Sequence, residues 1–494
     1  MSYLFDLIAR KISDPDKTFI ETDAGQTLSC RQMLSASARY ANALVAAGVA
    51  PGDRVAVQME KSPAVIFIYL ACLRAGAVFL PLNTAYTPHE VGYFLSDAKP
   101  RILVCDPDKA GAHAPCADQT GALILSHGAG MDGALFNRAA ASPDKFANVE
   151  RAKHDLAAIL YTSGTTGRSK GAMLTHDNLA SNALTLVDFW RFTADDVLIH
   201  ALPVYHTHGL FVATNTVLLA NARMVFLPKF SGPQVLAAMK RGTVLMGVPT
   251  FYTRLLEEPR LSREACANMR LFISGSAPLL AETHRAFEQK TGHLILERYG
   301  MTETNMSTSN PYDGARVAGT VGPPLPGVSL RVTDPDTGAD MPQGEIGMIE
   351  VKGPNVFSGY WNMPEKTAAE FRPDGFFITG DLGRIDDNGY VQIVGRGKDL
   401  IITGGLNVYP KEVEGEIDAL AGVVESAVIG LPDPDFGEAV TAVVVREKGA
   451  AIGEAEILKA LAGRLAKFKQ PKTIHFVDVL PRNAMGKVLR AELR

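Results

Sequence analysis

The sequence has few cysteines, and their spacing excludes two kinds of architecture. Only five of the 494 residues are cysteine. No two of them form a Cys-x-x-Cys pair, so neither a disulfide framework nor a zinc site is predicted. The five are Cys30, Cys72, Cys105, Cys116 and Cys266. A reduced compartment is the simplest setting for such a chain, and we expect a cytoplasmic protein.

Long apolar segments are lacking as well. The longest uninterrupted apolar run covers residues 64–73 and ends at Arg74. It is too short to span a bilayer, which takes ~20 residues. The first residues contain no basic segment and reach an acid at Asp6. We therefore expect neither a signal peptide nor a membrane partner.

An excess of positive charge is also absent. Lysine and arginine number 49 against 53 acidic residues, which gives a net charge of −4 and a pI of about 6.3. A general nucleic-acid-binding protein would need a basic excess, so that class is excluded. A small ligand that carries phosphate is not excluded.

The length and the patterning predict an α/β protein of at least two domains. Single cores rarely exceed ~250–300 residues. Strand-like runs alternate with helical patterns through most of the chain, for example at 55–59, 102–105 and 244–248. Such alternation is typical of largely parallel α/β sheets. We expect a large N-terminal domain with two α/β sheets.

After Gly322 the pattern changes to short β-like runs separated by strong turn signals, at 334–338 and 386–389. We expect a β subdomain there. A polar segment, 395–399, then precedes residues with helix and strand patterns of their own. We place a domain boundary between 396 and 397, with a small α+β domain over 397–494.

One segment has the composition of a polyphosphate-binding loop. Residues 161–171 read Tyr-Thr-Ser-Gly-Thr-Thr-Gly-Arg-Ser-Lys-Gly and follow a predicted strand. Glycines let the backbone present N–H groups to an anion, and Lys170 adds positive charge. The spacing is not that of a Walker loop. The alternative is an ordinary Gly/Ser surface loop. The candidate residues are Thr162, Ser163, Gly164, Thr165, Thr166, Gly167 and Lys170.

Four other segments are weak signals when each is taken alone. Residues 274–278 are small and follow a strand, which suits a flat ring but also suits a helix start with Pro278 near its first position. Residues 298–304 place Tyr299, which could stack on a base, beside a glycine and before a hydroxyl and Glu303. Glu303 could hold Mg²⁺ because Mg²⁺ needs only one or two carboxylates. Asp381 could accept ribose hydroxyls or occupy a turn. Lys487, in a loop-like run, would alone be a solvated lysine.

Taken in order, these segments resemble the adenylate-forming superfamily of acyl-CoA synthetases, peptide-synthetase adenylation domains and luciferases. The resemblance runs from about residue 25 to the end of the chain. It implies that ATP is bound by the loop named above together with a second set of residues. That set is Ser276, Ala277, Pro278, Tyr299, Gly300, Met301, Thr302, Asp381 and Arg396.

The resemblance also implies a two-step reaction and a mobile C-terminal lid. A carboxylate attacks the α-phosphorus of ATP to give an acyl-adenylate and pyrophosphate, and the thiol of coenzyme A then releases AMP. Glu303 would hold Mg²⁺, and Lys487 would bridge the carboxylate and the α-phosphate. Lys398 would be the hinge, and Gly404 and Gly405 would face CoA.

Within the superfamily the likeness is strongest to malonyl-CoA synthetases. Arg298 occupies a position where many relatives have glycine, and Arg254 lies in a helix that borders the acyl site of relatives, as do His206 and Thr207. A guanidinium suits a short dicarboxylate, whose far carboxylate must stay ionised and paired. Malonate or methylmalonate is therefore expected. The alternative is that an arginine pairs with a nearby structural acid, Glu297 or Glu257.

Three other functions are left open by the sequence. The chain could activate another small acid, such as acetoacetate or oxalate, or it could load a separate carrier protein. It could also be a non-catalytic nucleotide-binding relative, although the presence of both Lys487 and Glu303 argues against loss of catalysis. The amine of Lys487 would be a target for a lysine-acylating enzyme, since acylation removes its charge.

Overall fold

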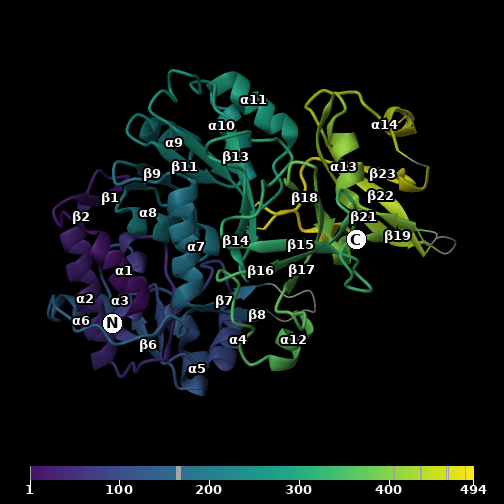
Figure 1. Cartoon of the computed structure of the whole chain (residues 1–494). Coiled ribbons are helices and arrows are strands. Elements are labelled where there is room, and N and C mark those ends of the chain that lie inside the picture. The colour runs from purple at the N-terminus through teal and green to yellow at the C-terminus, as the bar shows by residue number, and fades with distance from the viewer. Residues whose placement is uncertain are drawn as a thin grey trace.

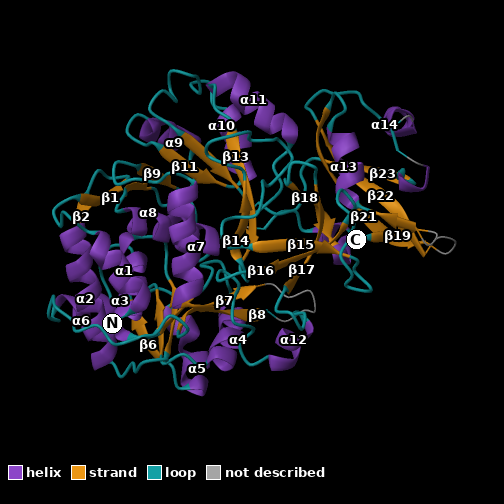
Figure 2. Ribbon diagram, in the orientation of Figure 1, coloured by secondary structure: helices purple, strands orange, loops and turns teal. Residues whose placement is uncertain are grey.

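The computed structural model of the chain describes residues 2–162, 169–403, 406–433, 437–462, 464–465, 467–483 and 486–494. Helices and strands alternate through the large N-terminal part, and a smaller group of elements from α13 and β19 onward gathers at one side (yellow in Figure 1; Figure 2). The expected α/β class, with a large part of several sheets and a smaller C-terminal part, is confirmed.

The larger of the two α/β sheets has eight strands in the order β14-β13-β12-β11-β9-β10-β1-β2. Its central pairs are parallel, and the pairs at its two edges, β13 with β14 and β1 with β2, are antiparallel. The strands are β1 Thr18–Thr22, β2 Thr27–Ser29, β9 Val197–His200, β10 Arg223–Phe226, β11 Val244–Gly247, β12 Leu271–Ser274, β13 Ile295–Met301 and β14 Asn305–Ser309.

The second α/β sheet has six strands in the order β6-β5-β3-β4-β7-β8. All its pairs are parallel except β7 with β8, which are joined through the expected phosphate loop. The strands are β3 Arg54–Gln58, β4 Val78–Pro81, β5 Ile102–Cys105, β6 Leu123–Ser126, β7 Leu156–Thr162 and β8 Lys170–Thr175.

One hydrophobic cluster joins both sheets and their helices into a single large core, because it contains residues of β3, β9, α2, α3 and α7. The helices of this part are α1 Tyr3–Lys11, α2 Cys30–Ala46, α3 Pro63–Ala75, α4 Pro88–Ala98, α5 Ala110–Thr120, α6 Ala134–Ala140, α7 His176–Phe189, the π-helix η1 His208–Thr214, α8 Asn215–Ala220, α9 Gly232–Met239, α10 Pro249–Leu256 and α11 Ala281–Thr291.

The apolar run at 64–73 lies in α3, which is buried on all sides. Pro63 is at its first turn, where no amide donor is needed, and Gly76 ends it in the left-handed region with φ 71°. A helix that is apolar all round belongs in the centre of a large core. No helix in the described part of the chain is long and apolar enough to cross a membrane.

The expected β subdomain is a four-stranded antiparallel sheet in the order β15-β16-β17-β18. A second sheet follows, in the order β20-β19-β22-β21, with β23 paired to β22. This sheet has its own hydrophobic cluster. The boundary at 396–397 falls directly after β18 and stays a prediction. The elements are β15 Ser329–Thr333, β16 Gly347–Lys352, α12 Pro364–Ala369, β17 Phe377–Ile385, β18 Val391–Arg396, η2 Gly397–Asp399, β19 Ile401–Thr403, β20 Leu406–Val408, α13 Pro410–Asp418, β21 Val423–Asp433, β22 Gly437–Arg446, α14 Glu454–Ala462, η3 Lys467–Lys469, β23 Thr473–Val477 and η4 Arg490–Leu493.

Candidate active site

Three residues expected to bind ATP come from three strands that meet at one carboxylate, that of Asp381, the residue expected to bind ribose. Asp381 on β17 accepts from Nε of Arg396 at 2.7 Å and from the hydroxyl of Tyr299 on β13 at 2.6 Å. Burial, followed by the negative charge of Asp381, raises the pKa of Tyr299 well above its usual value, so its hydroxyl remains a donor. The structure thus brings together three expected residues that lie far apart in the sequence.

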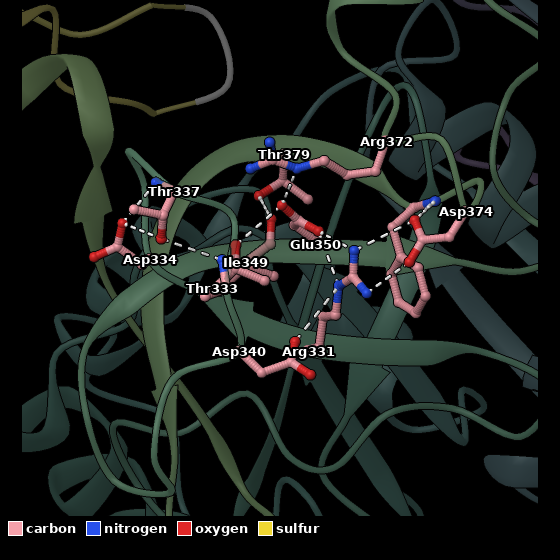
Figure 3. A network of polar contacts seen from close by, with 12 residues as sticks. Arg331, Thr333, Asp334, Thr337, Asp340, Ile349, Glu350, Arg372, Asp374 and Thr379 are labelled. Carbon is pink, nitrogen blue, oxygen red and sulfur yellow. Dashed lines mark hydrogen bonds and ion pairs between the residues drawn. The ribbon is translucent and has the colours of Figure 1, made fainter.

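A buried polar network supports the strand that carries Asp381 (Figure 3). The backbone N–H of Asp381 donates to the hydroxyl of Thr379 at 3.1 Å, and that hydroxyl donates to the carbonyl of Ile349 at 2.8 Å. The next residue, Glu350, is fully buried and accepts from Arg331 and Arg372. Paired charges of this kind are tolerated in a core only when every partner is satisfied.

The segment expected to lie near adenine forms a loop rather than a helix start. Residues 275–280 separate β12 from α11, so Pro278 lies three residues before the helix begins. The alternative of a helix start with Pro278 near its first position is therefore wrong. Ser276 adopts a left-handed φ of 72°, and its hydroxyl lies 3.1 Å from Nδ1 of His208. Gly300 and Met301 are the last residues of β13, and Thr302 begins the turn between β13 and β14.

The phosphate side contains Lys170 at the start of β8 and Thr162 at the end of β7. The Lys170 ammonium lies 3.2 Å from Oε1 of Glu370 and 4.1 Å from the centre of the Tyr360 ring. Residues Ser163, Gly164, Thr165, Thr166 and Gly167 lie outside the described residues. Their contact with phosphate stays a prediction.

Glu303, the expected metal ligand, lies beside Lys170 and is 4 % exposed. Its Oε1 lies 3.0 Å from the hydroxyl oxygen of Tyr360, and burial raises its pKa. Within the described ranges no group of three or more metal-binding side chains is present. One carboxylate next to a phosphate site is nevertheless the donor set that Mg²⁺ takes together with phosphate oxygens and water. Glu303 therefore fits Mg²⁺ bound with ATP.

The expected acyl side is formed by the turn before η1 and by β13. Nδ1 of His206 accepts from the backbone N–H of His208 at 3.2 Å, which leaves its Nε2 to donate. Burial, followed by the positive charge of Arg298, lowers the pKa of His206 to about 4, so the ring is neutral at pH 7. Thr207 donates to Oδ1 of Asn305 at 3.1 Å, and both residues are buried.

Arg298 is a buried cation whose donors are not all used. The residue is 3 % exposed, and its Nε and Nη2 have no hydrogen-bond partner in the described part of the chain. Its guanidinium lies directly against Gly275, where a Cβ would collide with it. Burial lowers its pKa to about 9, so it remains charged at pH 7. The neighbouring Glu297 accepts from the Gly319 amide at 3.3 Å and faces His284 at 3.5 Å, so the alternative that it pairs with Arg298 is wrong.

Arg254 lies elsewhere. It is exposed on α10 and lines a cavity of about 420 Å³ together with Phe230, Glu257 and Glu258. The structure does not bring it together with Arg298, and its role stays a prediction.

Lys487 is exposed in a tight loop that docks on the larger part of the chain. Its backbone N–H donates to Oδ1 of Asn483 at 3.0 Å, and Arg482 donates to the carbonyl of Gly486 at 2.6 Å. A Cβ on Gly486 would lie 3.1 Å from Oγ1 of Thr250 in α10. The catalytic candidate therefore lies next to the start of α10, the helix expected to border the acyl site.

The expected hinge residue, Lys398, is in the short helix η2 directly after β18. The next residue is Asp399. Its Oδ2 lies 3.9 Å from Nη1 of Arg490, and its Oδ1 lies 3.7 Å from Nη2 of Arg494. Gly404 and Gly405 lie outside the described residues, and their contact with CoA stays a prediction.

Three residues at the site were not expected from the sequence: Tyr360, Glu370 and Asn305. Tyr360 and Glu370 lie in a segment of ordinary composition, so no local pattern marks them. Asn305 follows Glu303 by two residues, so proximity to that motif was the only signal.

Comparisons with known proteins match this arrangement over the whole chain. The family model "AMP-binding enzyme" matches residues 10–361, and "AMP-binding enzyme C-terminal domain" matches residues 412–487. A feruloyl-CoA synthase from Amycolatopsis sp is 37% identical and covers 95% of this chain and 94% of the relative. A malonate–CoA ligase from Arabidopsis thaliana is 35% identical and covers 90% of this chain and 78% of the relative.

Solved structures are similar to this chain over its whole length. ATP-bound MatB from Rhodopseudomonas palustris is 65% identical, with a TM-score of 0.98 over 100% of this chain and 98% of that chain. The apo form of MatB from the same organism, also 65% identical with the same coverage, has a TM-score of 0.89. These matches cover both the ATP-site motifs and the segment that carries Lys487. The chain belongs to the AMP-binding enzyme family.

Proposed function

We propose that the chain is an ATP-dependent CoA ligase that forms malonyl-CoA, and also methylmalonyl-CoA, from the free dicarboxylic acid. Membership in the AMP-binding enzyme family supports an acid–thiol ligase that works through an acyl-adenylate. The similarity to a malonate–CoA ligase and to MatB supports this substrate class. The substrates are then ATP, CoA and a small carboxylic acid.

The choice of acid rests on Arg298, whose guanidinium is buried and has two nitrogens without a hydrogen-bond partner in the described residues. Burying a cation with unpaired donors is costly, so a protein retains such a cation where a ligand supplies the missing hydrogen-bond acceptors. The distal carboxylate of malonate would accept from the free Nε and Nη2 in a two-point contact. A monocarboxylate with an apolar tail would leave both nitrogens unpaired.

The neighbouring groups support a short acid. His206 is neutral at pH 7 and can donate through Nε2 without adding a second positive charge. Thr207 donates a hydrogen bond to Asn305, which fixes the orientation of its side chain. Arg254 remains a second candidate, but its exposure supports a weaker contribution than that of Arg298.

In the first half-reaction the substrate carboxylate attacks the α-phosphorus of ATP, and the bond from that phosphorus to the pyrophosphate breaks. Negative charge accumulates on the transferring group, and positioned cations stabilise it most in a site that excludes water. Lys487 would contact the α-phosphate and the acid, and Lys170 would contact the β- and γ-phosphates. Mg²⁺ bound at Glu303 would neutralise phosphate charge.

In the second half-reaction the thiol of CoA attacks the acyl carbon, loses its proton and expels AMP. Asp381, held by Arg396 and Tyr299, would keep the ribose in place during both steps. Rotation about Lys398 would replace the Lys487 loop with the face at Gly404 and Gly405. This movement is a proposal that follows from family membership.

The test is pyrophosphate release with Mg·ATP and CoA across malonate, methylmalonate, acetate, butyrate, coumarate and ferulate. We expect malonate to have the highest kcat/KM, with methylmalonate next. Preference for ferulate, the acid implied by the name of one relative, would keep the chemistry but exclude the role of Arg298. Turnover only with a carrier-protein thiol would favour a carrier-loading enzyme, and no turnover would favour a non-catalytic relative.

A cytoplasmic location and a lysine-acylating enzyme as a partner are further proposals. Lys487 is exposed, so its amine would be accessible, and acylation would remove the charge needed in the first half-reaction. A mass spectrum of the native protein that shows only unmodified Lys487 would contradict regulation by acylation.

A further inference from the structure

Glu370 makes an unusual set of contacts at the phosphate side of the site. It directly follows α12, and its backbone carbonyl accepts from the N–H of Ile378 on β17 at 2.8 Å. Its Oε1 lies 3.2 Å from Nζ of Lys170 and 2.8 Å from Nζ of Lys366. Its Oε2 accepts from the hydroxyl of Tyr360 at 2.6 Å. One carboxylate therefore joins Lys170, Lys366 and Tyr360, while the backbone of the same residue is fixed to β17.

Lys170 depends on this carboxylate. The lysine is only 9 % exposed, and a buried ammonium is tolerated when an anion compensates for lost hydration. Glu370 supplies that anion, while the face of the Tyr360 ring lies 4.1 Å away. An ammonium has three N–H donors. One is directed to Glu370, which leaves two for phosphate oxygens, so the ion pair orients Lys170 without blocking it.

Tyr360 extends the same arrangement to the metal ligand. Its phenolic oxygen lies between two carboxylates, 2.6 Å from Oε2 of Glu370 and 3.0 Å from Oε1 of Glu303. The backbone N–H of Phe357 also donates to the carbonyl of Glu303 at 2.7 Å. The side chains that would meet the phosphates and the metal are thus held through one shared tyrosine and one shared glutamate.

We propose that Glu370 is a positioning residue for the triphosphate of ATP, because it orients the Lys170 ammonium directly and the Glu303 carboxylate through Tyr360. This inference rests on the adenylation step proposed above and adds a residue that the motifs do not contain. Glu370 touches neither the acid nor the nucleoside. Its effect is therefore confined to ligands that carry β- and γ-phosphates or pyrophosphate.

The experiment is calorimetric titration of the full chain with Mg·ATP, Mg·pyrophosphate and AMP. The variant is Glu370→Gln, which keeps the volume and the acceptor for Tyr360 but removes the charge opposite Lys170. The matched control is Glu365→Gln, an exposed acid on α12, the helix that directly precedes Glu370. For Glu370→Gln we expect Kd to rise about ten- to a hundredfold for Mg·ATP and Mg·pyrophosphate, the range of one charge-assisted hydrogen bond. AMP affinity should remain within about twofold.

Coupling to Lys170 is the second measurement. If Glu370 acts through the lysine, Glu370→Gln should add little in a chain that already carries Lys170→Gln, because nothing remains to be oriented. Fully additive losses, unchanged Mg·ATP affinity, tighter Mg·ATP binding, or an equal loss for AMP would each overturn the proposal. The AMP titration also shows that each variant is folded.

The titrations separate this inference from the proposed function. If the unaltered chain binds Mg·ATP but does not form malonyl-CoA, the proposed substrate fails, and the comparison of the variants still decides the role of Glu370. If the unaltered chain binds neither Mg·ATP nor AMP, both proposals are overturned.

Discussion

Gly486 lies against Thr250, although the two residues belong to parts of the chain with separate hydrophobic clusters. A Cβ on Gly486 would be 3.1 Å from Oγ1 of Thr250, which lies in the first turn of α10. This contact places the segment before Lys487 next to the start of α10. The TM-score of 0.98 with ATP-bound MatB, against 0.89 with apo MatB, fits the same arrangement. The arrangement of the two parts is therefore more similar to that in ATP-bound MatB than to that in apo MatB.

Lys487→Ala should suppress the first half-reaction selectively. The lysine would stabilise charge that develops at the α-phosphate, and loss of one such group typically costs roughly 10²–10³-fold in rate. ATP–pyrophosphate exchange with malonate should fall by that factor. Thioester formation from supplied malonyl-adenylate should be unchanged, because a different face of the small domain would serve that step.

The control for this prediction is Lys459→Ala, an exposed lysine on α14 in the same part of the chain. It should leave both half-reactions unchanged. Equal losses in both half-reactions for Lys487→Ala would refute the assigned role.

Arg298→Met should reduce malonate use far more than Arg254→Gln. Truncating one partner of a buried charge pair costs ~2–5 kcal/mol, roughly 30- to several thousand-fold in kcat/KM. Arg254→Gln should lower kcat/KM by less than about fivefold, in line with the small energies of exposed charges. Steady-state kinetics with malonate and butyrate measure both effects. Unchanged malonate kinetics in Arg298→Met would remove this residue from the pocket.

Much of the fold was predictable because it depends on local pattern. Alternating helical and strand-like runs indicated parallel sheets, and the dense turn signals after Gly322 indicated the antiparallel subdomain. The apolar run at 64–73 was correctly excluded as a membrane span and proved to be the buried helix α3. Which strands neighbour one another was not predictable, because sheet order depends on packing between distant segments.

The site was predictable only where motifs mark it. Tyr299, Asp381 and Arg396 converge as the resemblance implied. Glu370 had no local signal, because its role depends on a contact with Lys170, 200 residues away in the sequence. Glu297 does not pair with Arg298 because adjacent residues of a strand point to opposite faces.

Gly209→Ala should weaken binding of the acid while sparing the nucleotide. A Cβ on Gly209 would collide with the carbonyl oxygen of Pro203, which is backbone and cannot move aside. The carbonyl of Gly209 also accepts from His200 at 2.8 Å and from Thr214 at 2.9 Å, so η1 is fixed on this side. Overpacking of this kind costs ~1–3 kcal/mol.

The strain should move the turn that carries His206 and Thr207. We expect KM for malonate to rise about ten- to a hundredfold, while Kd for Mg·ATP changes less than about threefold. Gly415→Ala is the control, since a Cβ there meets nothing within 4 Å. Unchanged KM for malonate in Gly209→Ala would show that η1 does not shape the acid site.

Asp418→Asn should stabilise the chain, and the gain should depend on pH. Burial raises the pKa of Asp418 to about 7, outweighing the hydrogen bond from Ser426 and the charge of Lys411, while Glu414 and Glu425 raise it further. Between pH 4 and 7 the folded state therefore binds a proton that the unfolded state has lost. Stability falls with rising pH wherever the folded state binds more protons, so this carboxyl costs most above pH 7.

Asparagine removes this cost and still accepts from the hydroxyl of Ser426, which lies 2.7 Å from Oδ1. The gain in free energy of unfolding should be near zero at pH 4, rise through pH 5 and 6, and level off above pH 7 at up to about 4 kcal/mol. Urea unfolding at each pH measures it, with Asp478→Asn, an exposed acid in the same part of the chain, as the control. A gain of equal size at pH 4 and pH 8 would mean that the unaltered Asp418 is not protonated in the folded state. The gain varies with pH only where the folded and unfolded states bind different numbers of protons.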